Sequence, residues 1–261
     1  MKRLSSPDNA LFKTLRSLAH EAAAVRRLGQ VWLEGIHLAE AALDAGLEPA
    51  SLVCTETGLA HPEIAALAHR VGDSRVVLLD SALWRALSAV GHGPEVGLLI
   101  RRPQPAAPRS GVTVVLDRVQ DAGNVGTLLR TAAAAGAATV VCLRGCAGVW
   151  TPKVLRAGMG AHFALALLEE VRWEDIEPRL PRPLYATSGQ GSRDLYQLDL
   201  RGDLSWVFGN EGAGVDPAVL ARCDAGVRIP QRGDVESLNV AAAAAVCLYE
   251  GLRQRIAAGR A

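Results

Sequence analysis

Short apolar runs alternate with longer amphipathic segments along most of the chain. Residues 9–27 have apolar side chains at helical spacing, which predicts a leading helix. Further on, short apolar runs are separated by segments with helical periodicity. This alternation predicts a compact α/β unit in the first hundred residues. We expect its strands at 31–33, 51–54, 76–79 and 96–100, and its helices at about 36–45, 60–69 and 81–89.

A proline-rich segment separates this unit from the rest of the chain. It contains Pro103, Pro105 and Pro108, whose rings can neither extend a helix nor join a central strand. We therefore expect a first domain at residues 1–102, a linker at 103–111 and a second domain at 112–261.

The second domain opens with a continuous apolar run at 112–117, typical of a strand buried on both faces of a parallel sheet. Further strands are predicted at 139–143, 164–168, 184–187, 204–208 and 226–230. Helices are predicted near 124–136, 151–160, 172–180, 216–223 and 238–255. The pattern indicates a doubly wound α/β domain, in which ligands bind at the carboxyl ends of strands. The loops after Asp117, Phe208 and Ile229 are therefore the first candidates for chemistry.

Composition places the chain among globular proteins that do not span membranes. Its 261 residues favour two domains, and 49% hydrophobic with 21% charged residues is typical of a folded protein. Charged residues or prolines interrupt every apolar run before the roughly 18 residues that a membrane span needs. The N-terminus lacks the apolar core of a signal peptide. We expect a cytoplasmic protein without membrane association.

Cysteine usage and charge narrow the possible ligands. The five cysteines are scattered and lack the spacing of a zinc or redox pair, so we expect no metal site. The net charge of +1 is too small for a histone-like nucleic-acid binder. Residues 1–28 nevertheless carry a net charge of +4, from six basic and two acidic side chains. Such a cluster indicates either an RNA-contacting arm or a solvated helix face.

The loop after Asp117 contains glycines but no G-x-G-x-x-G sequence, so the chain is a weak candidate for a nicotinamide dehydrogenase. Asn124 fits a helix cap as well as a functional residue. Gly126 and Arg130 are four residues apart, which places a small residue beside the arginine on one helix face. A guanidinium in that position suits a phosphate or a ribose.

The other two loops have comparable features. Glu211 lies between glycines just past a predicted strand, where glycine permits close approach of backbone to a ligand. After Ile229, a polar loop enters a long helix at Ser237-Leu238-Asn239-Val240, where several backbone N–H groups converge. Taken alone, Ser237 fits an N-cap and Asn239 a tolerated polar residue in the first turn.

Together these loops resemble the SpoU (TrmH) family of RNA 2′-O-ribose methyltransferases in the SPOUT superfamily. The motifs stand in the family's order and spacing: Asn124-Val125-Gly126 with Arg130, Phe208-Gly209-Asn210-Glu211-Gly212 with Gly214, and Ile229-Pro230 through Gly233 to Ser237-Leu238-Asn239-Val240. Residues 150–161 look like the family's segment between the first two motifs. Residues 33–38 look like the entry to its N-terminal substrate-binding domain, which is related in shape to ribosomal protein L30e. Ala122, Gly158 and Ala241 depart from the residues most common in the family.

The resemblance implies an α/β fold in which a small L30e-like domain precedes a SPOUT domain, a parallel sheet with a deep trefoil knot. It also implies S-adenosylmethionine as cofactor, RNA as substrate and a homodimer. The implied cofactor residues are Phe208, Gly209, Asn210, Gly212, Gly214, Ile229, Pro230, Leu238 and Asn239. The implied catalytic residues are Arg130, Asn124, Glu211, Ser237 and Asn239, and we expect RNA contacts from Lys13, Arg16, Arg26, Arg27 and Arg130.

The family assigns the arginine at position 130 to activation of the ribose hydroxyl. Arginine is always protonated in proteins and is therefore a poor general base. We expect Arg130 to bind a substrate phosphate and to stabilise the developing alkoxide. Asn124 would position the nucleotide or Arg130, while Glu211 and Asn239 would orient the arginine and the ribose. Ser237 would bind loop backbone or substrate, or would only cap the helix.

Large-subunit ribosomal RNA is the expected substrate, by analogy with the N-terminal domain alone. A transfer RNA 2′-O-methyltransferase is the alternative within the same chemistry. A non-catalytic RNA-binding protein that retains the SPOUT fold, and a SPOUT enzyme that methylates a base, are the competing functions.

Overall fold

The computed structural model describes residues 1–89, 91, 93–232 and 237–259. Contacts divide the chain into two compact units, Met1–Gln104 with Trp150–Phe163, and Pro105–Val149 with Ala164–Ala261. The first division falls inside the predicted linker. The segment around α8 (Pro152–Gly158) belongs to the first unit because it contacts the leading helix and a strand of that unit.

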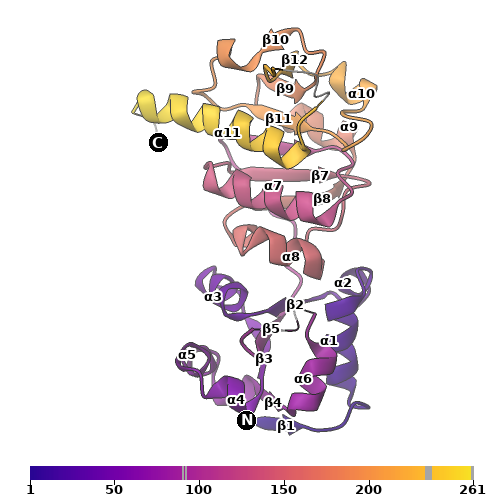
Figure 1. Ribbon diagram of the computed structural model, residues 1–261, viewed down its shortest axis with the longest axis vertical. Helices are drawn as coiled ribbons and strands as arrows, with labels where there is room; N and C mark the ends of the chain where they lie inside the picture. The colour runs from indigo at the N-terminus through magenta and orange to yellow at the C-terminus, as the bar shows by residue number, and fades with distance from the viewer. Residues whose placement is uncertain (90, 92, 233–236, 260–261) are drawn as a thin grey trace. The chain divides into compact units, whose positions relative to one another are not determined.

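The first unit is a mixed five-stranded sheet between two layers of helices (Figure 1). Its order is β1-β4-β3-β5-β2, and β5 is antiparallel to both of its neighbours. The strands are β1 (Lys2–Leu4), β2 (Gln30–Glu34), β3 (Pro49–Cys54), β4 (Val76–Leu79) and β5 (Val96–Arg101). The helices are α1 (Ala10–His20), α2 (Ala24–Leu28), α3 (Ile36–Asp44), α4 (Glu56–Leu59), α5 (Pro62–Val71) and α6 (Ser81–Leu87), with a 3₁₀ turn η1 (Asp73–Arg75).

Three features of this unit differ from the sequence prediction. The short helix α4 was not predicted, because its four residues are too few to show a helical periodicity. A single helix over 9–27 is wrong, because Glu21 takes an extended conformation (φ −110°, ψ 113°) and separates α1 from α2. The three-residue strand β1 was not predicted. Its sequence, Lys-Arg-Leu, is too short and too polar to show the alternation of a strand. Only its pairing with β4 identifies it.

The second unit is a seven-stranded sheet in which every pair is parallel, in the order β10-β12-β9-β11-β6-β7-β8. The strands are β6 (Thr113–Leu116), β7 (Thr139–Leu143), β8 (Ala166–Val171), β9 (Leu184–Thr187), β10 (Arg193–Asp194), β11 (Ser205–Phe208) and β12 (Ala225–Arg228). β6, β7 and β11 are buried at every position, which explains their continuous apolar sequences.

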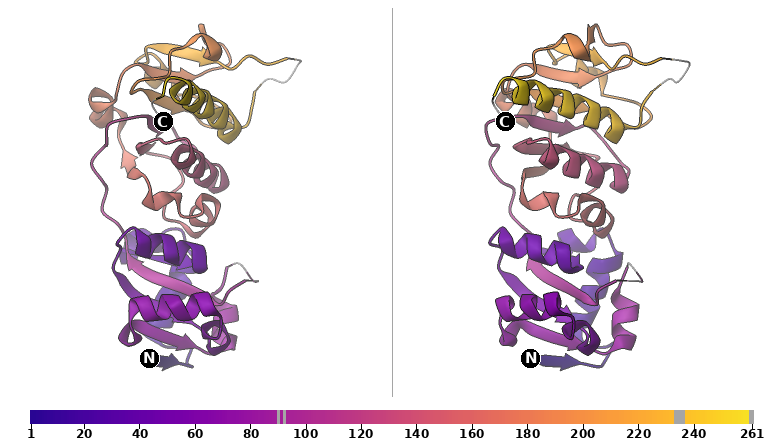
Figure 2. Two further views of the ribbon diagram at one scale, coloured as in Figure 1. Left: turned by 90° about the vertical axis from the view of Figure 1, so that its left-hand side faces the viewer. Right: turned by 60° about the vertical axis from the view of Figure 1, so that its left-hand side comes forward.

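Helices cover this sheet and complete the core. They are α7 (Ala122–Ala134), α9 (Trp173–Ile176), α10 (Pro217–Leu220) and α11 (Val240–Ala257), with the 3₁₀ turns η3 (Glu177–Arg179) and η4 (Leu195–Gln197). The 3₁₀ turn η2 (Ala161–Phe163) belongs to the first unit. α7 and α11 lie side by side (Figures 1 and 2). α9 and α10 contribute Ile176 and Val219 to a buried cluster with Val115, Val141 and Val207 of the sheet.

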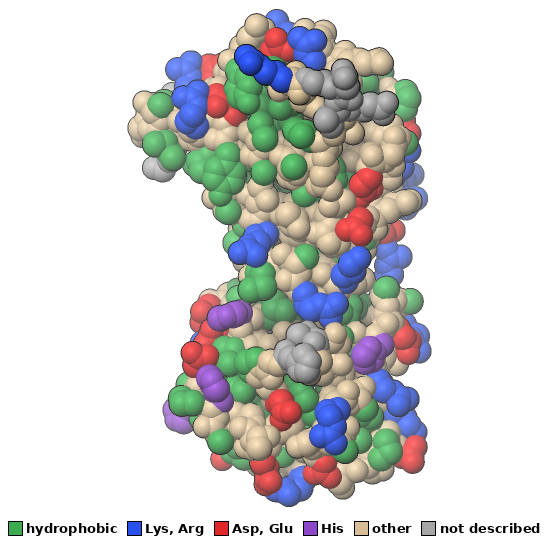
Figure 3. All heavy atoms as spheres, viewed as in Figure 1, with side chains coloured by type: hydrophobic (Ala, Val, Ile, Leu, Met, Phe, Trp, Pro, Cys, Tyr) green, Lys and Arg blue, Asp and Glu red, His purple; other side chains and the backbone are tan. Residues whose placement is uncertain are grey.

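The outer face of α11 is unusually apolar. Tyr249 and Ile256 are 49% and 60% exposed, and hydrophobic side chains gather over this helix in Figure 3. Such a patch is typical of an interaction surface. None of the described helices combines the length and apolar character that crossing a bilayer requires.

The strand order fixes where a site can form. β12, β9, β11 and β6 are consecutive neighbours and run parallel, so their carboxyl ends meet at one edge of the sheet. The loops after these four strands converge there, as expected for a ligand site in a doubly wound sheet.

Candidate cofactor pocket and active site

A cavity of about 480 Å³ opens at this edge of the sheet, within the size range of small-molecule sites. Five segments line it: the end of β9 with the loop after it, the loop after β11, the end of α10, the end of β12, and the entry to α11. The predicted residues Gly209, Asn210, Glu211, Gly212, Gly214, Ile229, Ser237, Leu238 and Asn239 are all part of the lining.

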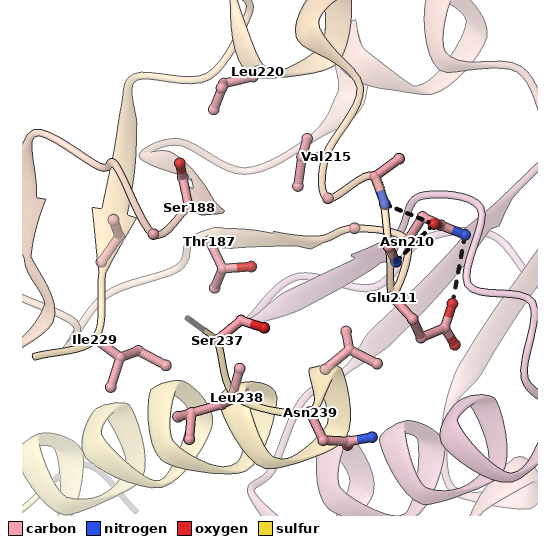
Figure 4. A pocket seen from close by; sticks show the side chains of 18 of the residues that line it. Thr187, Ser188, Asn210, Glu211, Val215, Leu220, Ile229, Ser237, Leu238 and Asn239 are labelled. Atoms are coloured by element: carbon pink, nitrogen blue, oxygen red, sulfur yellow. Dashed lines mark hydrogen bonds between the residues drawn. The ribbon is translucent and has the colours of Figure 1, made fainter. Parts of the chain in front are cut away.

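Apolar and polar groups share the wall of the cavity (Figure 4). Ile229 and Leu238 lie on one side of it, and Val215 and Leu220 on another. The cavity is also lined by residues 187–189, which the sequence analysis missed. Only the sheet order could have identified them, because it inserts β9 between β11 and β12.

The loop after β11 is held by its own backbone and by Asn210. Asn210 Oδ1 accepts hydrogen bonds from the amides of Gly212 and Ala213, both at 3.0 Å, and the Asn210 and Gly214 backbones pair with each other. A Cβ on Gly209 would lie 2.2 Å from the Gly214 carbonyl carbon, so only glycine fits. Here the close approach that we predicted for a ligand is made by the loop itself.

Glu211 ties this loop to the start of α7. Its carboxylate accepts hydrogen bonds from the backbone amides of Gln120 (3.4 Å) and Asp121 (3.2 Å) and from Asn124 Nδ2 (3.0 Å). Burial acts to raise the pKa of Glu211, but these hydrogen bonds outweigh it and hold the pKa below its usual value. Glu211 is therefore an ionised acceptor at neutral pH.

Asn239 connects the third motif to the first. Its Oδ1 accepts from the amides of Ala241 (2.9 Å) and Ala242 (3.4 Å), which makes it the N-cap of α11. Its Nδ2 donates to Asn124 Oδ1 at 3.1 Å. The interpretation of Ser237 as the cap is wrong: Ser237 is exposed at the pocket wall, two residues before the cap. Asn239, Asn124 and Glu211 thus form a hydrogen-bonded chain that links the start of α11, the first turn of α7 and the loop after β11.

Asn124 is also not the cap of its own helix. Asp121 fills that role, because its side chain accepts from the Asn124 amide at 2.8 Å. The Asn124 side chain uses its oxygen for Asn239 and its nitrogen for Glu211. This arrangement fixes the orientation of the Asn124 side-chain amide. Asn124 therefore connects the start of α11 with the loop after β11.

Three predicted residues lie elsewhere. Phe208 is fully buried and stacks on Trp206 with ring centroids 6.0 Å apart. Neither Phe208 nor Pro230 is among the described residues of the pocket lining. Arg130 is exposed on α7 and also outside that lining, and within the described part of the chain its guanidinium makes no hydrogen bond or ion pair. Gly233 of the third motif lies outside the described residues.

The basic cluster of the leading helices is partly paired. Lys13 forms an ion pair with Asp8 at 3.0 Å and Arg27 with Glu21 at 2.8 Å. Arg16 lies 6.0 Å from the centroid of the Phe12 ring. Arg26 is exposed on α2. Among the residues that the structure describes, no three His, Cys, Asp or Glu side chains gather as metal ligands.

Similar proteins match this chain over nearly its whole length. An uncharacterised tRNA/rRNA methyltransferase of Synechocystis is 36% identical, covering 98% of this chain and 95% of its own. The "23S rRNA (guanosine(2553)-2'-O)-methyltransferase RlmP" of Bacillus subtilis is 31% identical, covering 95% and 98%. The SpoU methyltransferase AviRb of Streptomyces viridochromogenes, crystallised with its cofactor AdoMet, superposes with a TM-score of 0.84 at 27% identity, covering 95% and 98%.

Both the whole-chain relatives and the family profile support the family assignment. The relatives span nearly the whole chain, so the likeness includes both units. The sequence profile of the SpoU rRNA Methylase family matches residues 111–249, which contain all three motifs and the pocket. The chain therefore belongs to the SpoU rRNA methylase family.

Proposed function

We propose that this protein transfers a methyl group from S-adenosylmethionine to a ribose 2′-hydroxyl in large-subunit ribosomal RNA. The observation that carries the proposal is the chain Asn239–Asn124–Glu211, which joins the three family motifs around one pocket. The relatives named for 23S ribosomal RNA support the substrate. Such a substrate agrees with the cytoplasmic location expected from the sequence.

The pocket fits S-adenosylmethionine in chemistry. Ile229, Leu238 and Leu220 offer apolar surface for an adenine, and the hydroxyls of Thr187 and Ser188 offer partners for polar groups. Among the described lining residues, Glu211 is the only one with a charged side chain. A wall with negative and no positive side chains suits a cationic sulfonium. When bound, S-adenosylmethionine supplies an electrophilic methyl on a leaving group that is already cationic.

The protein's own residues therefore have to position the hydroxyl and to stabilise the negative charge that develops on its oxygen as the proton leaves. Glu211 accepts four hydrogen bonds, and both ends of the Asn124 amide are in use, so these two residues hold the loops. Arg130 remains available for substrate. We assign it to a phosphate of the RNA and to the developing alkoxide, because a guanidinium donates several hydrogen bonds and does not release a proton.

We further propose a homodimer formed through α11, in which Arg130 of one subunit completes the pocket of the other. Two observations support it: Arg130 lies outside the described pocket lining, and α11, which packs on Arg130's helix α7, presents exposed Tyr249 and Ile256. An isologous interface is the usual arrangement of a homodimer. The same surface patch would then lie on both sides of the contact.

The reaction is tested by incubating the protein with labelled S-adenosylmethionine and, separately, ribosomal RNA and transfer RNA from cells lacking the gene. Nucleoside analysis should recover label as a 2′-O-methylnucleoside from ribosomal RNA. Label in transfer RNA would support the alternative substrate, label in a base would favour the base-methylating function, and no label would leave a binding protein. Mapping the modified position by comparing RNA from cells with and without the gene then identifies the nucleotide.

The dimer is tested by mixing two inactive variants, Arg130→Ala and Gly209→Ala. If Arg130 acts across the interface, half of the randomly mixed dimers contain one intact site, and activity should return to about a quarter of the wild-type value. If Arg130 acts within its own subunit, mixing restores nothing. Sedimentation of the wild-type protein as a monomer would overturn the dimer altogether.

A further inference from the structure

An ion pair between a buried carboxylate and a partly exposed guanidinium lies behind the wall of the pocket. Asp117 ends β6 and is 2% exposed. Its carboxylate accepts hydrogen bonds from Arg118 Nε (2.8 Å), Arg118 Nη2 (3.0 Å) and the Asp216 amide (2.7 Å). A buried charge is tolerated only when it is paired and hydrogen-bonded, so the Asp117 carboxylate requires the contacts from Arg118 and Asp216.

Arg118 adopts a backbone conformation that is unusual for its residue type. Its φ is +56°, in the left-handed region where non-glycine residues are uncommon. This conformation directs the Arg118 carbonyl to Asn210 Nδ2, which donates to it at 2.9 Å. It also lets the side chain turn back onto the neighbouring Asp117. Gly145 leaves room for that side chain, because a Cβ on Gly145 would lie 3.2 Å from Arg118 Cγ.

Asp117 and Arg118 therefore bind both ends of the loop after β11. At the start of that loop, Asn210 is bound to the Arg118 carbonyl. At its end, the Asp216 amide is bound to Asp117, and the Asp216 carboxylate lies 3.5 Å from Arg118 Nη2. Residues 210–215 between these points form one wall of the cavity and include Glu211. Neither Asp117 nor Arg118 is among the described residues of the lining.

We propose that Asp117 and Arg118 are positioning residues that set the cofactor-binding wall without touching the cofactor. This inference rests on the proposed function, because the ligand of that wall is S-adenosylmethionine. The Asp117 carboxylate and the Arg118 guanidinium hold the end of the loop at Asp216, and the Arg118 carbonyl, set by the conformation of that residue, holds its start at Asn210. The loop determines where its amides and Val215 meet the ligand. Loosening the pair should therefore weaken cofactor binding more than it slows methyl transfer by the bound complex.

The test uses two substitutions of Arg118 in the full-length protein. Arg118→Gly keeps the left-handed backbone, which glycine adopts freely, and removes the guanidinium. Arg118→Lys keeps the charge but not the two-pronged contact. We expect Arg118→Gly to raise the dissociation constant and KM for S-adenosylmethionine at least about tenfold, as loss of a charge-assisted contact predicts, with a much smaller change in kcat. Arg118→Lys should recover part of the affinity. Titration calorimetry measures the binding without depending on activity.

Arg182 provides a matched control. It is partly exposed like Arg118 (44% against 36%) and pairs with the buried Glu177 at 2.5 Å and with Asp224 at 3.1 Å. It precedes β9, whose other end carries the pocket residue Thr187. Arg182→Ala should lower the melting temperature and leave the affinity for S-adenosylmethionine at the wild-type value.

The outcomes separate the two proposals. If both Arg118 variants bind S-adenosylmethionine as tightly as the wild type while losing thermal stability like Arg182→Ala, the pair is only structural and the inference is wrong. Unchanged binding with a lowered kcat also contradicts it. If the wild-type protein itself neither binds S-adenosylmethionine nor methylates RNA, the proposed function fails first, and the inference fails with it.

Discussion

Asn239 Nδ2 donates a hydrogen bond to Asn124 Oδ1 at 3.1 Å, although the two residues are 115 positions apart in the chain. The same Asn239 side chain caps α11 through its oxygen. One residue thus combines a local stabilising role with a contact that joins two functional loops. Substitutions that remove one role and keep the other can separate them.

Asn239→Asp should keep the cap and lose the link. An aspartate accepts from the first amides of α11 as well as asparagine does, but it cannot donate to Asn124. We expect a melting temperature close to the wild type and a clear loss of methylation. Asn239→Ala removes both roles and should also destabilise the protein by about 1 kcal/mol. Thermal melts and initial rates measured on both variants make the comparison, and full activity in Asn239→Asp would show that the link is dispensable.

Arg130→Ala should slow methyl transfer about 100-fold or more, the usual effect of removing a donor that stabilises a developing oxyanion. Arg130→Lys should recover only part of the rate, because an ammonium lacks the planar fork that binds a phosphate through two contacts. Both variants should fold normally, since Arg130 is exposed. Single-turnover methylation of ribosomal RNA is the measurement. A wild-type rate in the alanine variant would remove Arg130 from the mechanism.

Gly209→Ala should abolish cofactor binding, since its Cβ would lie 2.2 Å from the Gly214 carbonyl carbon and the backbone there cannot move without opening the loop. Gly202→Ala, just before β11 and outside the described pocket lining, is the control. Beyond its chain neighbours, no heavy atom lies within 4 Å of its added Cβ. Calorimetric titration with S-adenosylmethionine should give no heat for Gly209→Ala and a signal close to the wild type for Gly202→Ala. Equal binding by the two variants would contradict the steric argument.

The hydrogen bonds to Glu211 predict a specific pH dependence. Its pKa in the folded protein is depressed below the ordinary 4.5, because bonds from Asn124 and the backbone outweigh its burial. The stabilisation is therefore complete above the unfolded pKa and disappears as pH falls through the folded pKa. The difference in melting temperature between wild type and Glu211→Gln should be constant from pH 8 to about 5 and shrink in more acidic solution. If the difference in melting temperature instead grows as the pH falls, the pKa of Glu211 is raised in the folded protein, not lowered.

The cysteines should differ in reactivity. The hydrogen bond with Cys142 is the main cause that lowers the pKa of the Cys146 thiol. Burial raises the pKa of Cys54 to about 11 and of Cys223 to about 12, and it also raises that of Cys247. Because the thiolate is the nucleophile, iodoacetamide at pH 8 should modify Cys146 first. Peptide mapping at short times checks the order, and earlier modification of Cys54 or Cys223 would contradict it.

Local patterns were sufficient for most of the second unit. The strand predicted at 139–143 has those bounds in β7, because continuous apolar sequence marks a strand buried in a parallel sheet. The strand predicted at 184–187 also has those bounds in β9, where buried and half-buried positions alternate. The same kind of reasoning failed at helix starts. Ser237 and Asn239 are equally good caps by residue type, and only the path of the chain into α11 decided between them.

The sequence by itself determined the fold class, the family, and nine of the 19 described pocket-lining residues, because these depend on periodicity and on motifs that are short in sequence. Tertiary structure alone placed residues 187–189 in the pocket, since β9 pairs between β11 and β12. It also showed that Glu211 and Asn124 hold loops together, and that Asp117 and Arg118 lie behind the pocket wall. The physical reason is that hydrogen bonds between distant segments depend on the order and register of the strands, which local side-chain patterns do not specify.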